Sequence, residues 1–114
     1  MENCIFCKII AREIPSKTVY EDETTVAIED LHPQAPVHLL ILPREHIEML
    51  AGVRPEDEGL IGHLLRVAAE LARSQGIESR GYRTVINNGA GAGQSVFHLH
   101  VHLLGGRVFH WPPG

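Results

Sequence analysis

The chain has 114 residues and a formal net charge of −4; 44% of its residues are hydrophobic and 21% are charged. This length fits one domain over residues 1–114 with a core of its own. A negative net charge gives no electrostatic reason to expect a nucleic-acid or membrane partner, since both are usually bound through a basic patch. No apolar run approaches the roughly 18 residues of a membrane-spanning helix, and the start, Met1-Glu2-Asn3-Cys4, lacks the features of a secretory signal. We therefore expect a cytoplasmic protein.

A cysteine pair stands near the start of the chain. Cys4 and Cys7 form a Cys-x-x-Cys motif that leads into a short helix, predicted at 8–12 and ended before Pro15. In a reducing compartment this spacing favours half of a metal site over a disulfide. Plain reduced thiols and a redox pair are the alternatives. Zinc would need two further ligands, which the histidines of the chain can supply.

The next segments predict strands. Residues 18–21 and 24–30 are rich in β-branched side chains and predict a hairpin. A loop with two prolines, 31–36, precedes an apolar run over 37–42, which predicts a strand buried on both faces. His38 is the polar exception in that run. It is either a satisfied core residue or a hydrogen-bond partner for a histidine on a neighbouring strand.

The central part of the chain predicts helices. We expect a short helical segment at 47–50 and the main helix at 55–74, where Pro55 suits the first turn and apolar residues recur at spacings of three and four. Gly76 is the expected C-terminal cap. His63 lies off the apolar stripe, so we expect it in solvent.

A strand predicted at 82–88 is followed by a glycine-rich segment, 89–95. Glycines at alternate positions let main-chain N–H groups approach an anion such as phosphate, although a flexible hairpin loop has the same composition. The chain ends in Trp-Pro-Pro-Gly, and an exposed Trp111 predicts an ordered tail docked on a partner surface.

His98, His100 and His102 alternate with aliphatic residues and predict a half-buried strand over 98–104. On one strand the three imidazoles share a face, with neighbours about 6.6 Å apart. Three interpretations compete: a polar strand face, a zinc site, and catalysis by imidazole itself. The spacing alone does not separate the last two.

This histidine run, preceded by Gly-Gln-Ser-Val at 93–96, resembles the histidine-triad (HIT) superfamily of nucleotide hydrolases and transferases. The likeness to its Hint branch extends over most of the chain, through residues 5–10, 13–15, 33–38, 81–83 and 111–114. It implies the α+β HIT fold, with a five-stranded antiparallel sheet, one long helix and one short helix. It also implies a homodimer in which two sheets join into a continuous ten-stranded sheet.

The resemblance further implies hydrolysis of purine nucleoside 5′-phosphoramidates, in which AMP is linked through nitrogen to an amine, by way of a nucleotidyl-histidine intermediate. His100 would be the nucleophile, His102 would hold the phosphate oxygens and His38 would hydrogen-bond His100. Ser95 would lie at the leaving nitrogen. Imidazolium and main-chain N–H donors can stabilise the phosphate, so no catalytic metal is expected. The expected catalytic set is His38, Ser95, His98, His100 and His102.

The same resemblance assigns residues to the nucleotide. Asp30 would bind the ribose hydroxyls, and Trp111 resembles a tail residue that reaches the other subunit's substrate site. The residues expected around the phosphate are Asn87, Gly93, Gln94 and Ser95. Those expected to wall the purine base are Ile5, Phe6, Ile9, Ile28, Leu31 and Leu40.

Many bacterial HIT proteins resemble zinc binders through a Cys-x-x-Cys, a downstream histidine and the first histidine of the triad. Mapped onto this chain, the ligands of a structural zinc would be Cys4, Cys7, His46 and His98, so that His98 would turn away from the catalytic row. Other functions stay open: hydrolysis of dinucleoside polyphosphates or nucleotidyl sulfates, a nucleotide-binding regulatory or scaffold protein with incidental hydrolysis, and a hydrolase activated by zinc on the three histidines.

Overall fold

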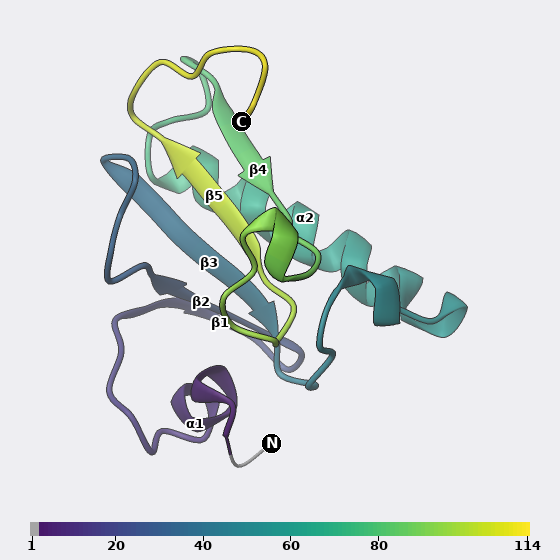
Figure 1. The fold of residues 1–114 in the computed structure, drawn as a ribbon. Helices are drawn as coiled ribbons and strands as arrows, with labels where there is room; N and C mark the ends of the chain where they lie inside the picture. Colours follow the sequence, from purple (N-terminus) through teal and green to yellow (C-terminus); the bar gives the residue numbers. More distant parts are fainter. Residues whose placement is uncertain (1–2) are drawn as a thin grey trace.

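The computed structural model describes residues 3–114 and contains one five-stranded antiparallel sheet in the order β1-β2-β3-β5-β4 (Figure 1). Helix α2 packs across β3 and β5 on one face of the sheet, and the short helix α1 lies on the other face. The α+β fold and the five-stranded antiparallel sheet expected from the sequence are confirmed. The elements are α1 (Ile5–Ile10), β1 (Thr18–Glu21), β2 (Thr25–Glu29), β3 (Val37–Pro43), α2 (Glu58–Ser74), β4 (Tyr82–Val85) and β5 (Val101–Gly105). Met1 and Glu2, which contribute to the expectation of no secretory signal, lie outside the described residues.

The sheet separates two apolar clusters because alternate residues of a strand leave opposite faces. The cluster under α2 includes Ala27, Leu39 and Ile41, and the cluster under α1 consists of Cys4, Phe6, Val26, Ile28, Leu40 and Leu42. Leu40 lies opposite His102 in the pairing of β3 with β5, and His38 lies opposite Leu104. His38 and His102 therefore belong to the α1 face, which is where the candidate site lies.

Helix α2 confirms the amphipathic pattern read from the sequence. The buried stripe consists of Leu64, Val67, Ala68, Leu71 and Ala72. A 3-10 turn at Pro55–Asp57 precedes the α-helix, so the predicted start at 55 falls in that turn. Gly76 follows the helix with φ +75°, the left-handed conformation that glycine adopts without a Cβ clash. Within residues 3–114, no helix is long and apolar enough to cross a membrane.

Other predicted boundaries also differ from the structure. Helix α1 begins at Ile5 rather than at 8, because the Cys4 thiol caps it by accepting the Cys7 N–H at 3.3 Å. The helical segment expected at 47–50 is a 3-10 turn at Leu50–Gly52. Strand β4 ends at Val85, because that residue pairs with His102 near the start of β5.

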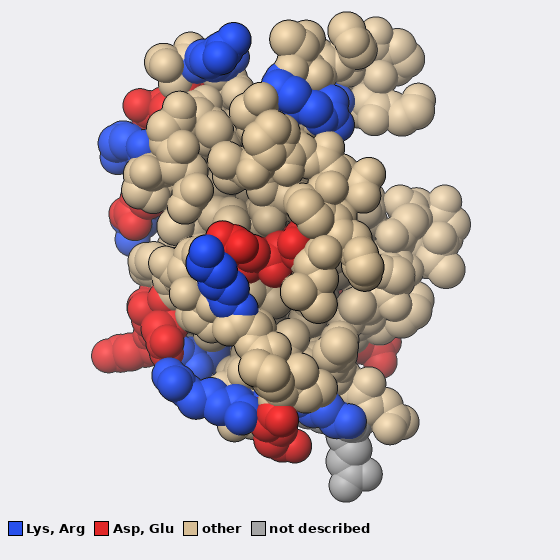
Figure 2. Space-filling model, turned by 90° about the vertical axis from the view of Figure 1, so that its left-hand side faces the viewer, with Lys and Arg blue, Asp and Glu red and all other residues tan. Residues whose placement is uncertain are grey.

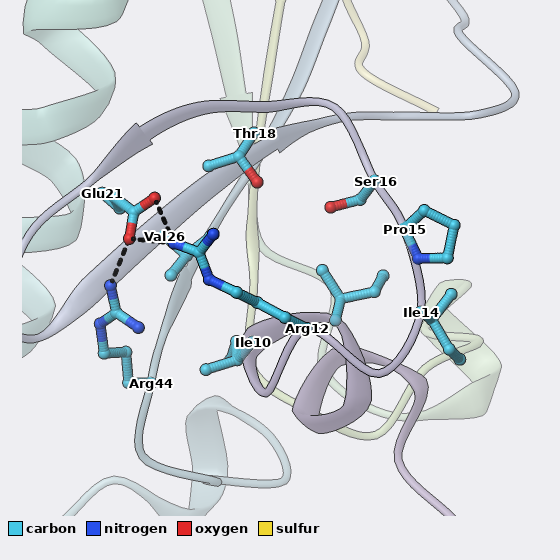
Figure 3. Close-up of a pocket in the computed structure, with 10 residues that line it drawn as sticks. Ile10, Arg12, Ile14, Pro15, Ser16, Thr18, Glu21, Val26 and Arg44 are labelled. Atoms are coloured by element: carbon cyan, nitrogen blue, oxygen red, sulfur yellow. Dashed lines mark hydrogen bonds and ion pairs between the residues drawn. The ribbon is translucent and has the colours of Figure 1, made fainter.

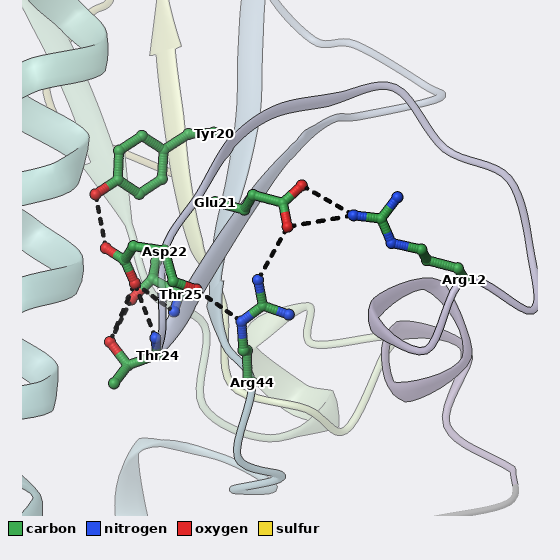
Figure 4. A network of polar contacts seen from close by, with 7 residues as sticks. All are labelled: Arg12, Tyr20, Glu21, Asp22, Thr24, Thr25 and Arg44. Atoms are coloured by element: carbon green, nitrogen blue, oxygen red, sulfur yellow. Dashed lines mark hydrogen bonds and ion pairs between the residues drawn. The ribbon is translucent and has the colours of Figure 1, made fainter.

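Asp22 ties the turn between β1 and β2 to helix α2. Its Oδ1 accepts the N–H groups of Thr24 and Thr25 at 2.9 Å each, and its Oδ2 accepts the Tyr20 hydroxyl at 2.6 Å (Figure 4). Oδ2 also accepts His63 Nε2–H at 2.7 Å, so the expectation of a solvated His63 is wrong. Burial raises the pKa of Asp22, but these hydrogen bonds outweigh it and hold that pKa well below its usual range.

Paired surface charges border the outer end of the α1 face. A cavity of about 220 Å³ lies between α1 and the β1–β2 edge, and Arg12 extends beside it to reach Glu21 at 3.3 Å (Figure 3). Arg44 binds the same carboxylate at 3.1 Å. On the face shown in Figure 2, positive and negative side chains are interspersed rather than gathered by sign.

Candidate active site

The three histidines of the row do not share one strand. Strand β5 begins at Val101, so His102 lies on it, whereas His98 and His100 lie in irregular backbone before it. The Leu99 N–H donates to the Ile47 carbonyl at 2.6 Å instead of joining the sheet. The prediction of a strand from residue 98 is therefore wrong at its start, and His98 is fully buried beside the cysteine pair. The ring centroids of His100 and His102 lie 5.0 Å apart.

A main-chain carbonyl fixes the tautomer of His100. Its Nδ1 lies 2.7 Å from the His98 carbonyl oxygen, which can only accept, so Nδ1 carries the proton. Burial lowers the pKa of His100, so the ring is neutral at pH 7. Its Nε2 then keeps a free lone pair, the feature that a nucleophilic imidazole needs. Phe6 packs edge-on against this ring, with 5.0 Å between centroids.

The tautomers of His38 and His102 follow from a second main-chain group. The Gln34 N–H donates to His38 Nδ1 at 3.0 Å, so neutral His38 carries its proton on Nε2. That Nε2–H donates to His102 Nδ1 at 2.9 Å, which leaves His102 with its proton on Nε2. The prediction that His38 bonds His100 is wrong, because β3 and β5 pair so that His38 and His102 meet. Asp30 lies beside the pair, with 3.4 Å between its Oδ2 and His38 Nε2.

Burial keeps these imidazoles neutral at pH 7. It lowers the pKa of His102 to about 4, helped by the neighbouring rings of His100 and His38. It also lowers the pKa of His38, although the nearby Asp30 carboxylate opposes the change. An imidazolium donor, as expected from the sequence, is therefore not the resting form of the site. A phosphate oxygen would meet the Nε2–H of a neutral His102.

Four nitrogen and sulfur atoms of Cys4, Cys7, His46 and His98 meet beside the start of helix α1. Cys4 Sγ lies 3.4 Å from His98 Nδ1, and Cys7 Sγ lies 3.4 Å from His46 Nδ1 and 3.6 Å from His98 Nδ1. All four ligand atoms lie within 4.8 Å of one another. Tetrahedral zinc, with bonds of about 2.3 Å to sulfur and about 2.0 Å to nitrogen, places such ligands roughly 3.5 Å apart. The four residues lie close enough to hold a metal ion, and their spacing fits zinc.

The orientation of His98 also suits a metal. Its Nε2 lies 2.8 Å from the Pro43 carbonyl and so donates to it, which leaves the Nδ1 lone pair facing the two thiols. Burial lowers the pKa of His98 to about 4, so its ring is neutral at pH 7, the form that binds a metal. Burial and the adjacent Cys4 raise the pKa of the Cys7 thiol. A bound cation would offset that effect, since cysteine ligates metals as the thiolate.

Only some of the residues predicted to contact the purine base lie together in the structure. Phe6, Ile28 and Leu40 pack in the α1 cluster, with Ile9 against them. Leu31 is 85% exposed and stands apart from that wall, and Ile5 is half-exposed. Trp111 is 81% exposed on the C-terminal tail. Contact of each of these residues with a nucleotide stays a prediction.

Gln94 supports the glycine-rich loop from inside. The side chain is buried; its Oε1 accepts the Gly89 N–H at 2.7 Å, and its Nε2 donates to the carbonyls of Glu48 at 2.8 Å and Val96 at 3.1 Å. The N–H groups of Gly93 and Gln94 also donate within the loop, around a 3-10 turn. The side chain of Gln94 therefore positions the loop, and sequence patterns alone do not reveal this role. Phosphate contacts by Asn87, Gly93 and Gln94 stay predictions.

Folding stability is expected to fall as the pH drops below about 6.5. The pKa of His102 is about 4 in the folded chain, against about 6.5 when unfolded. Between these values the unfolded state binds more protons, so stability falls by up to about 1.4 kcal/mol per pH unit and is independent of this group above pH 6.5. Urea unfolding at pH 7.5, 6.5, 5.5 and 4.5 measures the slope. A His102→Asn variant lacks this titrating group, so its unfolding free energy should depend less steeply on pH, by up to about 1.4 kcal/mol per pH unit. An unchanged slope would contradict the low pKa of His102.

Comparisons with known proteins agree with this geometry. The family described as "Scavenger mRNA decapping enzyme C-term binding" matches residues 3–108. An uncharacterised HIT-like protein of Synechocystis sp. is 55% identical over 113 residues, covering 99% of this chain and 98% of the relative. The crystal structure of a HIT family hydrolase from Legionella pneumophila has a TM-score of 0.96 at 48% identity, covering 98% of this chain and all of that one. A HIT family hydrolase from Clostridium thermocellum has a TM-score of 0.94 at 47% identity, covering 96% of each chain. The resemblance seen in the histidine run is thus confirmed over nearly the full length, and the chain belongs to the histidine-triad superfamily.

Proposed function

We propose that this protein hydrolyses purine nucleoside 5′-phosphoramidates, cleaving the P–N bond between an AMP-type nucleotide and an amine. The observation that supports this most directly is the pair of opposite tautomers. His100 presents a free Nε2 lone pair, and His102 presents an Nε2–H. One ring can attack phosphorus while the other donates to a phosphate oxygen, and neither has to change its protonation state first.

The proposed reaction has two displacements. In the first, His100 Nε2 bonds to the α-phosphorus, the P–N bond breaks, and the amine leaves with a proton supplied through Ser95. In the second, water attacks phosphorus, the bond between phosphorus and His100 Nε2 breaks, and AMP and neutral His100 are released. The proton lost by the attacking water replaces the one that the amine took through Ser95. The nucleotidylated ring carries a positive charge, which the His98 carbonyl stabilises because it already accepts the Nδ1–H at 2.7 Å.

The nucleotide would lie along the α1 face of the sheet. Phe6, Ile28 and Leu40 offer an apolar wall for a purine, and Phe6 also contacts His100. Asp30 lies beside His38, where its carboxylate can accept hydrogen bonds from the ribose hydroxyls. In this proposed arrangement, ribose and base would lie on one side of the reacting phosphorus.

We also propose that Cys4, Cys7, His46 and His98 hold a structural zinc ion. Four nitrogen and sulfur donors complete a tetrahedral site, so the ion would have no open position for substrate or water. Its contribution would be to join helix α1, the segment after β3 and the segment before β5. The catalytic groups are then the imidazoles of the chain itself.

A second copy of the chain is the proposed protein partner. Strand β4 lies at one edge of the sheet, and an edge strand carries unpaired N–H and C=O groups along its outer side. Pairing of two β4 strands would give the ten-stranded sheet that the resemblance implies. The exposed Trp111 could then reach the partner's substrate site.

The substrate assignment is tested by comparing kcat/KM for AMP phosphoramidate and for a dinucleoside polyphosphate. The second substrate is the sharpest rival, because the matching family is named for mRNA decapping. We expect a phosphoramidate preference of at least about tenfold, or roughly 1.4 kcal/mol in transition-state binding. A preference for the polyphosphate would overturn the assignment. Tight AMP binding without turnover of either compound would favour a nucleotide-binding regulatory protein instead.

A further inference from the structure

A cavity opens beside Ser95. Its volume is about 380 Å³, within the size range of small-molecule sites. Its walls include Ile5, Ser95, Val96 and Phe97, together with Cys4 and His46 of the metal cluster. It lies between the start of helix α1 and the segment that leads from the glycine-rich loop into His98.

The apolar walls of this cavity are unusually exposed. Ile5 and Phe97 are each 43% exposed, although both flank fully or largely buried residues, Phe6 and His98. Apolar side chains that line a concave space together are typical of small-molecule binding sites. None of the described residues that line the cavity is Asp, Glu, Lys or Arg. The polar groups on its walls are those of Asn3, Cys4, His46 and Ser95, and its apolar walls are Ile5, Val96 and Phe97. Among the described residues, the cavity therefore offers apolar contacts and no carboxylate that could pair with a cation.

The cavity adjoins the apolar cluster that packs against His100. Val96 lines it and also packs against the apolar cluster that holds Phe6. The Phe6 ring lies 5.0 Å from the His100 ring. An in-line displacement requires the leaving group to lie on the side of phosphorus opposite the attacking nitrogen. Ser95, proposed to supply the proton to the leaving nitrogen, lines this cavity.

We propose that this cavity binds the organic part of the leaving amine and that it selects neutral apolar amines over cationic ones. The proposal rests on the proposed phosphoramidate hydrolysis and specifies its substrate class. An alkyl or aryl group gains contact with Ile5, Val96 and Phe97. A leaving amine with an ammonium group at its far end would lose the hydration of that charge in the cavity. None of the described residues on the cavity walls has a carboxylate that could pair with it.

The test uses three AMP conjugates, linked to ammonia, to pentylamine and to one end of 1,5-diaminopentane. The last two match in length and differ in terminal charge. We expect the wild type to prefer the pentylamine conjugate over the diamine conjugate by at least about tenfold in kcat/KM. Phe97→Ala should lower kcat/KM for the pentylamine conjugate by about tenfold and change that for the ammonia conjugate less than about twofold. Leu65→Ala, which truncates a similarly exposed side chain on α2, is the matched control and should change neither.

Binding separates this proposal from the proposed function. In the His100→Ala background, calorimetry compares the dissociation constants of the ammonia and pentylamine conjugates, and Phe97→Ala should remove the difference. Turnover without any preference for pentylamine, or equal losses for both conjugates in Phe97→Ala, would overturn the cavity assignment alone. Preferential binding of the pentylamine conjugate, without turnover by the wild type, would support the cavity while overturning the phosphoramidase assignment.

Discussion

Replacing His100 with alanine is expected to lower kcat for AMP phosphoramidate by at least about 10⁴-fold, the loss typical of a removed nucleophile. No neighbouring ring can replace it. His102 carries its proton on Nε2, because His38 donates to its Nδ1, so neither nitrogen of His102 has a free lone pair with which to attack. The residual rate should therefore be that of a protein that binds the substrate without attacking it. Steady-state kinetics measures the loss, and mass spectrometry of rapidly quenched wild-type protein should detect the nucleotidyl adduct on His100.

His102→Ala provides the matched control. This variant keeps the nucleophile and its hydrogen bond to the His98 carbonyl, but lacks the proposed donor to the phosphate. We expect the adduct to form slowly in His102→Ala and not at all in His100→Ala. Circular dichroism and thermal unfolding should show that both variants fold. An adduct that persists in folded His100→Ala would assign the attack to another residue.

Removal of zinc is expected to produce the largest loss of stability. Protein purified without chelator should contain about one zinc per chain. With free zinc about 1000-fold above its dissociation constant, binding stabilises the fold by about 4 kcal/mol. For a domain of this size, the melting temperature should then fall by roughly 15 °C on chelation. Elemental analysis together with differential scanning calorimetry checks both expectations.

Two variants of helix α1 sharpen the zinc test. Cys7→Ser removes a ligand and should reproduce the effect of the chelator, whereas Lys8→Ala alters the adjacent residue and should retain zinc and stability. If chelation abolished turnover while leaving the melting temperature unchanged, the metal would be catalytic rather than structural. Zinc-free protein of unaltered stability would contradict the metal site itself.

Much of this architecture is predictable from sequence because it depends on side-chain periodicity. The stripe on α2 identifies its buried face, and the apolar run of β3 identifies a strand buried on both faces. The resemblance identifies the four candidate zinc ligands, which the fold brings within 4.8 Å of one another. The start of β5 was not predictable in the same way. The pattern His-x-His-x-His continues through residues where the backbone has left the sheet, because burial of His98 against the cysteines gives the same alternation as a strand.

The partner of His38 could not be predicted either. The apolar run places His38 in a buried strand, but whether it meets His100 or His102 depends on the register between β3 and β5, which no local pattern contains. The tautomers depend on main-chain groups, the Gln34 N–H and the His98 carbonyl. Every residue except proline carries an N–H and every residue carries a carbonyl, so the sequence does not reveal which of these will act.

The hydrogen bond from the Gln34 N–H fixes the donor and acceptor roles along the chain of hydrogen bonds that ends at His102. Gln34 lies in the loop between β2 and β3, and the order of donors from Gln34 to His38 to His102 begins with its main-chain N–H. In a loop conformation without this donor, His38 could hold its proton on Nδ1. His102 would then carry its proton on Nδ1 and have a lone pair on Nε2. That lone pair would repel the negatively charged oxygen of a bound phosphate. Under the proposed function, the backbone of this loop would govern substrate recognition together with the Asp30 side chain at its start. Remodelling the loop would then change catalysis while every histidine stayed in place.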